Sequence, residues 1–362
     1  MGLFELIITL YLGVMIYFAN LADLHSTSAL ATSTSFSILP PYLTVVRRMI
    51  FGLITMVFLF GIYADRVLLL DLLPSQFEEF GISPSAVNSS SVIFICVLTI
   101  IVGLASLLLI LWPIVRQRIS VLFGSKAHYN PESQVHLVAM ILALSLVAYL
   151  FTNFVLGGGL NGVAQSVEEN GISLGTLVFQ GIMFIMVACL GIGLMIRRTV
   201  PQSLERLGLK TPTPQNVLIG IGAGIGLIII SVSMTLIWTK LVTPEQYAQQ
   251  SAAAAEIESQ FNTIQAAFLL ALTSAVSEEI LFRGALQPIF GIPLTTVLFV
   301  LFHNQYTFTP AMLIILVVGS GLAVLRRYQG TTSAIIAHFI YNFVPIALVI
   351  LLPQAAQFLG LS

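Results

Sequence analysis

The sequence predicts an all-α membrane protein, a polytopic bundle of about ten transmembrane helices, and three observations support this. The 362 residues are 57% hydrophobic, with a mean hydropathy of +1.01. Only 8% are charged, against about 25% in a typical soluble domain. The apolar residues form continuous runs rather than the alternation of a β-barrel, and a helix satisfies its own backbone groups inside a bilayer.

The individual spans follow from the length of the apolar runs, since a helix needs ~20 residues to cross the hydrocarbon core. Ten segments approach this length, and the eighth is short. They cover residues 3–20, 46–64, 91–115, 135–156, 172–196, 216–241, 263–287, 293–307, 309–325 and 332–353.

The orientation of the spans follows from the basic residues, which gather in alternate loops. The loops 65–90, 157–171 and 243–262 are acidic or neutral instead. The positive-inside rule then places the basic loops in the cytoplasm and both termini outside. The basic residues in or beside the predicted cytoplasmic loops are Arg47, Arg48, Arg116, Arg118, Lys126, Arg197, Arg198, Arg206, Lys210, Arg326 and Arg327.

The segment 199–215, "TVPQSLERLGLKTPTPQ", divides the chain. Its Pro and Gly residues and its polar character are typical of an interfacial linker. We expect an N-terminal bundle of about five spans over residues 1–198 and a C-terminal core over 216–353. Residues 243–262 are expected to form an outer loop with a marginal Ala-rich helix. The net charge of −1 suggests no nucleic-acid partner, and the apolar composition makes membrane lipids the expected partners.

The C-terminal core contains a cluster of polar residues within apolar segments. A charged side chain at the bilayer centre costs ~2.5–3.5 kcal/mol, so such residues are functional candidates. The first two hundred residues hold no comparable cluster. The candidates are Glu278, Glu279 and Arg283 in "SEEILFRG", His303 at the end of "FVLFH", and His338 and Asn342 in "HFIYN".

Helical spacing predicts which of these side chains share a face of their helix. Glu279 and Arg283 are four residues apart, on one face, in the order that favours pairing. Glu278 is rotated by about 100° from its neighbour, so it can point elsewhere. Three helices can therefore direct Glu278 and the polar residues of the two later segments toward one point.

The chemistry of this set suits hydrolysis of a peptide bond within the membrane. A carboxylate beside an imidazole, such as Glu278 with His303, can deprotonate a water molecule. A second imidazole and an amide, His338 and Asn342, can stabilise an oxyanion. The Glu279–Arg283 pair would neutralise charge and hold the helix face rigid.

The motifs E-E-x-x-x-R, F-x-x-x-H and H-x-x-x-N, in this order on separate helices, resemble those of the CAAX protease and bacteriocin-processing (CPBP, or Abi) family. That family includes the type II CAAX prenyl endopeptidase, an intramembrane glutamate protease. The resemblance covers roughly residues 200–353 and implies a CAAX-protease-like catalytic core. It implies Glu278 as the general base assisted by His303, an oxyanion hole of His338 and Asn342, and supporting roles for Glu279 and Arg283.

The predicted function is therefore an intramembrane endopeptidase acting on a peptide or a membrane-anchored protein, prenylated or not. We expect a multi-pass protein of a prokaryotic plasma membrane, with its active site toward the cytoplasm. We expect no cofactor, although two Glu and two His are plausible zinc ligands; the H-E-x-x-H spacing of zinc proteases is absent. Two other classes stay open, a non-catalytic scaffold or bacteriocin-immunity protein and a transporter.

Overall fold

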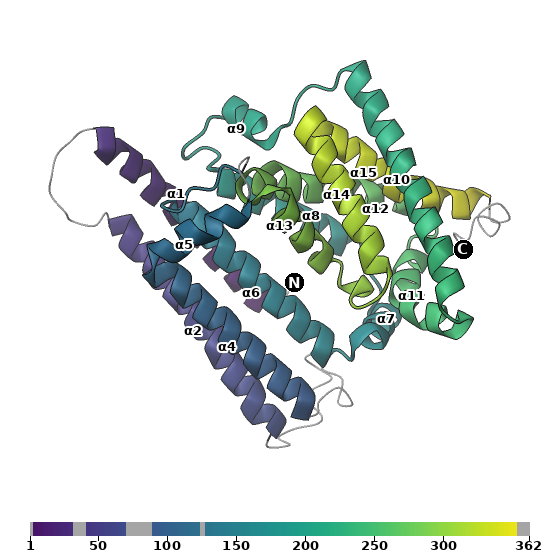
Figure 1. The fold of residues 1–362 in the computed structure, drawn as a ribbon, viewed down its shortest axis with the longest axis horizontal. Helices are drawn as coiled ribbons and strands as arrows, with labels where there is room; N and C mark the ends of the chain where they lie inside the picture. The colour runs from purple at the N-terminus through teal and green to yellow at the C-terminus, as the bar shows by residue number, and fades with distance from the viewer. Residues whose placement is uncertain (1–2, 32–40, 70–88, 124–126, 353–362) are drawn as a thin grey trace.

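The computed structural model describes residues 3–31, 41–69, 89–123 and 127–352, and these residues form helices with no strand (Figure 1). Eight helical segments are long and apolar enough to cross a membrane by length and composition. The chain is therefore a multi-pass membrane protein, and the all-α prediction is confirmed. Lys126 and most of the loop 65–90 lie outside the described residues.

The N-terminal part is a bundle of long helices that lies on one side of the molecule in Figure 1. Helix α8 contacts α1 of this bundle and also α12 of the C-terminal part. The long helices are α1 (Leu3–Ala31), α2 (Pro41–Leu69), α4 (Ser89–Leu111), α6 (Gln134–Leu156) and α8 (Leu174–Ile192), with the shorter α5 (Pro113–Ser120), η3 (Val121–Phe123) and α7 (Gly159–Asn170) between them.

The C-terminal part begins after a short helix, α9 (Val200–Leu207), that packs against the segment η4. This η4 is a π-helix, and it continues α12 directly into α13. The elements are α10 (Pro214–Leu241), α11 (Pro244–Ser259), α12 (Ile264–Glu278), η4 (Glu279–Leu286), α13 (Gln287–Phe302), η5 (Asn304–Tyr306), α14 (Ala311–Gln329) and α15 (Thr331–Leu351).

The two parts share a hydrophobic cluster. Met15 of α1, Ile50 of α2 and Ile141 of α6 are fully buried in the same cluster as Phe290 of α13. A second cluster joins α8 to η4 and α13. The predicted linker 199–215 therefore separates two groups of helices that pack on each other, and its role as a domain boundary stays a prediction.

The eight candidate spans differ from the ten predicted segments at two places. The predicted spans 263–287 and 293–307 belong to one continuous run, Ile264–Phe302, which bends at Gly291. The φ of 72° at this residue lies in the left-handed region, and an added Cβ would lie 2.4 Å from the carbonyl oxygen of Phe123. The predicted span 46–64 lies within helix α2, and residues 57–64 of it lie outside the part whose side chains the structure describes.

Close packing of α10 on α15 depends on two glycines of the run "IGIGAGIG". A Cβ at Gly220 would lie 2.9 Å from the Ile336 side chain, and one at Gly224 would lie 2.7 Å from the carbonyl oxygen of Ala337. Gly222 and Gly226 have no heavy atom within 4 Å of such a Cβ. The expected role in helix packing therefore holds for one face of the run.

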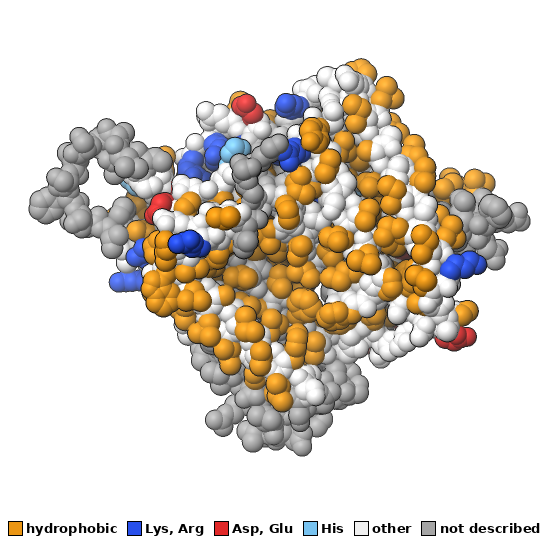
Figure 2. Space-filling view, viewed as in Figure 1, with side chains coloured by type: hydrophobic (Ala, Val, Ile, Leu, Met, Phe, Trp, Pro, Cys, Tyr) orange, Lys and Arg blue, Asp and Glu red, His pale blue; other side chains and the backbone are white. Residues whose placement is uncertain are grey.

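The surface is apolar over most of the visible face, as a lipid-facing protein requires (Figure 2). Lys and Arg side chains gather mainly along the upper and left edges in this view, where α9 and α5 lie (Figure 1). Helices α7 and α11 pack against each other at the other end of the molecule. The basic residues thus gather at the end that the positive-inside rule assigns to the cytoplasm.

Candidate active site

The two adjacent glutamates lie where α12 becomes the π-helix η4. The sequence predicted an uninterrupted α-helix here. A π-helix bonds each N–H one residue further back than an α-helix, and such segments occur frequently at functional sites. The side chain of Glu279 is 0% exposed and that of Glu278 is 18% exposed. Two consecutive residues therefore carry a fully buried carboxylate and a partly exposed one.

Glu279 belongs to a buried cluster of ionisable groups. Its Oε1 lies 3.0 Å from Nη1 of Arg283 and 2.9 Å from Nδ1 of His338. The predicted pairing of Glu279 with Arg283 is therefore present. Contact with His338 was not predicted, because helical spacing gives no contact between separate helices.

Arg283 fixes this cluster to helix α14. Its Nη2 donates to the carbonyl oxygen of Gly319 at 3.1 Å, and its guanidinium carbon lies 4.0 Å from the ring centroid of Phe299. An added Cβ at Gly319 would lie 3.0 Å from the Phe299 ring, so a larger residue there would compete with this ring for space. Only 1% of the Arg283 side chain is exposed.

Glu278 faces a cavity of about 460 Å³ together with His303, His338 and Asn342. The expected convergence of these four residues from three helical segments is therefore present. Oε2 of Glu278 lies 4.0 Å from Nε2 of His303 and accepts no hydrogen bond from any described residue.

The imidazole of His303 and the amide of Asn342, which line the cavity with Glu278, are both held in place by hydrogen bonds within the protein. Nδ1 of His303 lies 2.8 Å from the carbonyl oxygen of Phe299, which can only accept, so Nδ1 carries the proton. Nε2 of His303 is then free to accept or to bind a second proton. Nδ2 of Asn342 donates to Oγ of Ser274 at 3.0 Å, which orients the amide and leaves its second N–H unused.

Part of the cavity wall comes from helix α11, which was expected to be an outer loop with a marginal helix. Tyr247 and Glu258 of α11 line the cavity, as do Tyr306 and Tyr341. Burial raises the pKa of Glu258, and burial followed by the charge of Glu258 raises that of Tyr306. The polar composition of α11 gave no signal that this helix folds back over the site.

The metal-binding alternative depends on whether the donors lie together. In the part of the chain that the structure describes, no group of three or more His, Cys, Asp or Glu side chains could hold a metal ion. Two of the four candidate ligands, Glu279 and His338, are bonded to each other beside a guanidinium. The arrangement therefore does not resemble a zinc site.

Residues 260–344 match the model of a protein family described as type II CAAX prenyl endopeptidase Rce1-like. The match supports, for this part of the chain, the resemblance drawn from the sequence motifs. The matched region contains all six candidate residues, the whole of α12, η4, α13 and α14, and most of α15. The family supports a CAAX-type protease function in general. No curated protein and no solved structure matches the chain significantly.

Proposed function

We propose that this protein is an intramembrane endopeptidase in which Glu278 activates water for attack on a peptide bond. The observation that carries the proposal is the division of the glutamate pair. Glu279 is held by Arg283 and His338 with no exposed surface, whereas Glu278 lines the cavity and is 18% exposed. A base must have a lone pair available beside the substrate, and Glu278 meets this requirement.

The first step is formation of the nucleophile. The 4.0 Å between Glu278 Oε2 and His303 Nε2 is too long for a direct hydrogen bond and suits one water molecule bonded to both atoms. Glu278 removes a proton from this water while the oxygen adds to the carbonyl carbon. Such general-base assistance contributes about 10²–10⁴-fold to a rate.

The second step is stabilisation of the oxyanion that forms on the carbonyl oxygen. Asn342 can donate its second amide N–H, since the first is bonded to Ser274. Nδ1 of His338 lies 2.9 Å from Oε1 of Glu279, and a ring that carries protons on both nitrogens would donate from Nε2 to the oxyanion. The C–N bond then breaks, and Glu278 returns its proton to the leaving amine. No covalent bond between Glu278 and the substrate forms.

The reaction is proposed to proceed without a metal ion. Arg283 already neutralises Glu279 at 3.0 Å, and a second cation at this carboxylate would be repelled by the guanidinium. Glu278 and His303 then provide two donors, fewer than the three protein ligands typical of a catalytic zinc site.

The proposed substrate is a peptide or a membrane-anchored protein with a carboxyl-terminal or juxtamembrane segment that enters the cavity. Apolar side chains on the wall, including Ile314, Ile315 and Ile346, suit an apolar stretch next to the scissile bond. The family supports CAAX-type cleavage in general, and the proposal includes both prenylated and unprenylated segments as substrates.

We place the protein in a prokaryotic plasma membrane, with access to the site from the cytoplasm as predicted from the basic loops. The cavity extends from Glu278 toward α11, at the end opposite these loops. Cytoplasmic access therefore requires either a path beside η4 or an orientation that the positive-inside rule does not give. Treating intact cells that carry a Tyr247→Cys variant with a membrane-impermeant thiol reagent distinguishes these two alternatives. Labelling of the new cysteine would place α11 outside the cell and would require the path beside η4, whereas no labelling would favour the reversed orientation.

The proposed function is tested by comparing peptide termini in the membrane proteomes of cells that carry wild type or Glu278→Gln. Glu168→Gln, at an exposed position on α7, is the matched control. We expect a set of carboxyl-terminal fragments in wild type and control cells that is missing in the Glu278→Gln cells. Identical termini in all three would contradict proteolysis and favour the non-catalytic scaffold.

A further inference from the structure

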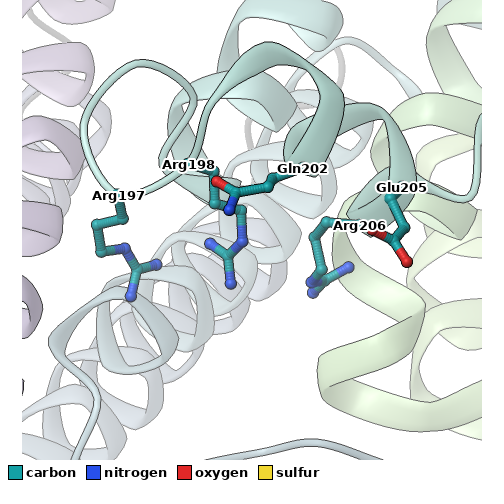
Figure 3. A pocket seen from close by; sticks show the side chains of 5 residues that line it. All are labelled: Arg197, Arg198, Gln202, Glu205 and Arg206. Carbon is teal, nitrogen blue, oxygen red and sulfur yellow. The ribbon is translucent and has the colours of Figure 1, made fainter.

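A second site lies at the basic end of the molecule, away from the cavity. The chain leaves α8 in a tight turn and enters α9, and side chains of this stretch surround a pocket of about 460 Å³ (Figure 3). We call it the arginine pocket. It is lined by Arg197, Arg198, Gln202, Glu205 and Arg206. Three cations and one carboxylate give the lining a formal charge of +2.

Two of the three guanidinium groups of the pocket, those of Arg198 and Arg206, are positioned by backbone carbonyls rather than by carboxylates. Arg206 Nη1 donates to the carbonyl oxygen of Gly284 at 2.9 Å, and Arg198 donates to that of Ile192. A carbonyl orients a guanidinium without cancelling its charge. Only Arg197 of the three has a carboxylate partner among the described residues, Asp23 at 3.3 Å.

The charges are close enough to act on one another. Burial, followed by the neighbouring Arg198, Arg326 and Arg197, lowers the pKa of Arg206 to about 10. Burial also lowers the pKa of Arg197, where the charge of Arg198 adds to the effect and Asp23 opposes it. All three arginines are still protonated at neutral pH. An anion bound among them would relieve their mutual repulsion.

A phosphate group is the anion that this arrangement fits best. Each guanidinium presents a planar fork of N–H donors that matches the oxygens of a phosphate. In Figure 3 the three arginine side chains extend to the same side of the turn and of α9, and Gln202 lies beside them. Glu205 is the one group of the lining that would repel the ligand.

The surroundings indicate that the phosphate belongs to a lipid. The pocket directly follows the end of a candidate span at Ile192, at the level where headgroups lie. Three apolar side chains beside it are exposed: Met195 by 80%, Val200 by 50% and Leu204 by 45%. Val200 and Leu204 are one turn apart on α9, so they form an apolar edge next to the arginines. Such an edge can contact acyl chains, whereas inorganic phosphate has no apolar part that could contact it.

We propose that the arginine pocket binds a phosphate group, and that its source is the headgroup of an anionic phospholipid. Basic pockets at the cytoplasmic ends of transmembrane helices are suited to such headgroups. Because Arg206 also holds the carbonyl oxygens of Gly284 and Ala285, the bound lipid would lie one side chain away from the π-helix.

The test is a binding titration of the purified full-length protein in a neutral detergent. The ligands are phosphatidylglycerol, phosphatidylcholine of the same chain length and inorganic phosphate, and bound lipid is counted by native mass spectrometry. The variant Arg198→Gln/Arg206→Gln is compared with Arg118→Gln/Lys240→Gln, which removes the same charge at exposed positions elsewhere. We expect phosphatidylglycerol to bind at least about tenfold more weakly to the first variant and unchanged to the control.

A third variant keeps the test valid if loss of Arg206 disturbs folding. Glu205→Gln removes the repelling carboxylate from an exposed position, so phosphatidylglycerol should bind more tightly to it. Equal binding of phosphatidylglycerol and phosphatidylcholine, equal weakening in both double variants, or no gain with Glu205→Gln would each overturn the proposal. Saturable binding of inorganic phosphate that displaces the lipid at similar concentration would support the phosphate site and overturn the lipid as its source.

Discussion

The buried cluster around Glu279 and the cavity-facing pair of Glu278 and His303 are adjacent regions with opposite physical character. In the cluster, one carboxylate oxygen lies 3.0 Å from a guanidinium and 2.9 Å from an imidazole, with no exposed surface. In the cavity, the other carboxylate is 18% exposed and lies 4.0 Å from an imidazole. The difference teaches that two adjacent identical side chains can lie in opposite environments, one suited to an anchor and the other to the proposed base, because the helix turns between them.

The comparison is tested most strongly by removing the proposed base. Glu278→Gln keeps the shape of the side chain and removes its ability to take a proton. We expect the rate of cleavage by the purified protein to fall by about 10³-fold or more, near the upper part of the range for general-base catalysis. The melting temperature should equal that of wild type, since Oε2 of Glu278 makes no hydrogen bond.

Removing the charge of Glu279, the proposed anchor, should lower the stability of the protein, which removing the base should leave unchanged. Glu279→Gln leaves the guanidinium of Arg283 buried without a charge partner, which costs about 3–5 kcal/mol in the free energy of unfolding. The melting temperature should fall strongly, and the double variant Glu279→Gln/Arg283→Met should recover part of the loss. A Glu279→Gln protein as stable as Glu168→Gln would show that the cluster is no anchor.

The oxyanion donor proposed at Asn342 gives a smaller effect. Asn342→Ala should lower kcat by about 10²-fold with KM nearly unchanged, as expected for a donor that acts on the transition state. Ser274→Ala, which only frees the amide that Ser274 orients, should lower kcat less. If Asn342→Ala raised KM alone, the residue would bind the ground state instead.

A second carboxylate in the cavity, Glu258, is expected to make stability depend on pH. Burial raises its pKa in the folded protein above the usual 4.5, so the folded state keeps its proton in a window where the unfolded chain loses it. Stability from this group is then present below pH 4.5 and falls as the pH rises through the window. Thermal unfolding of wild type and Glu258→Gln from pH 4 to 7 should show a steeper decline in wild type, and parallel curves would contradict this.

The smallest expected effect is that of a chelator. If Glu278 and His303 act without a metal, cleavage by purified protein should proceed at the same rate after treatment with EDTA or phenanthroline. Loss of activity that zinc alone restores would show that the cavity residues are ligands and would reverse the roles proposed for the two regions.

Much of the fold and of the candidate site could be predicted from the sequence. Apolar runs locate helices because each bilayer crossing needs a long one, and the spacing of Glu279 and Arg283 correctly predicted their pairing. Helical periodicity gives the face of a side chain and not its neighbour on another helix. It therefore missed the bond between Glu279 and His338. Nor does it give the π-helix, the contact of Arg283 with Gly319 on α14, or the place of α11 in the cavity wall.

The measurement that tests the central claim most directly is a single turnover of the purified protein in ¹⁸O-labelled water, followed by mass spectrometry of the product and of the protein. If Glu278 removes a proton from the attacking water, each new carboxyl terminus carries one ¹⁸O atom and the peptide that contains Glu278 carries none. Incorporation of ¹⁸O into Glu278 would show that its carboxylate attacks the substrate itself, and would contradict its role as the base.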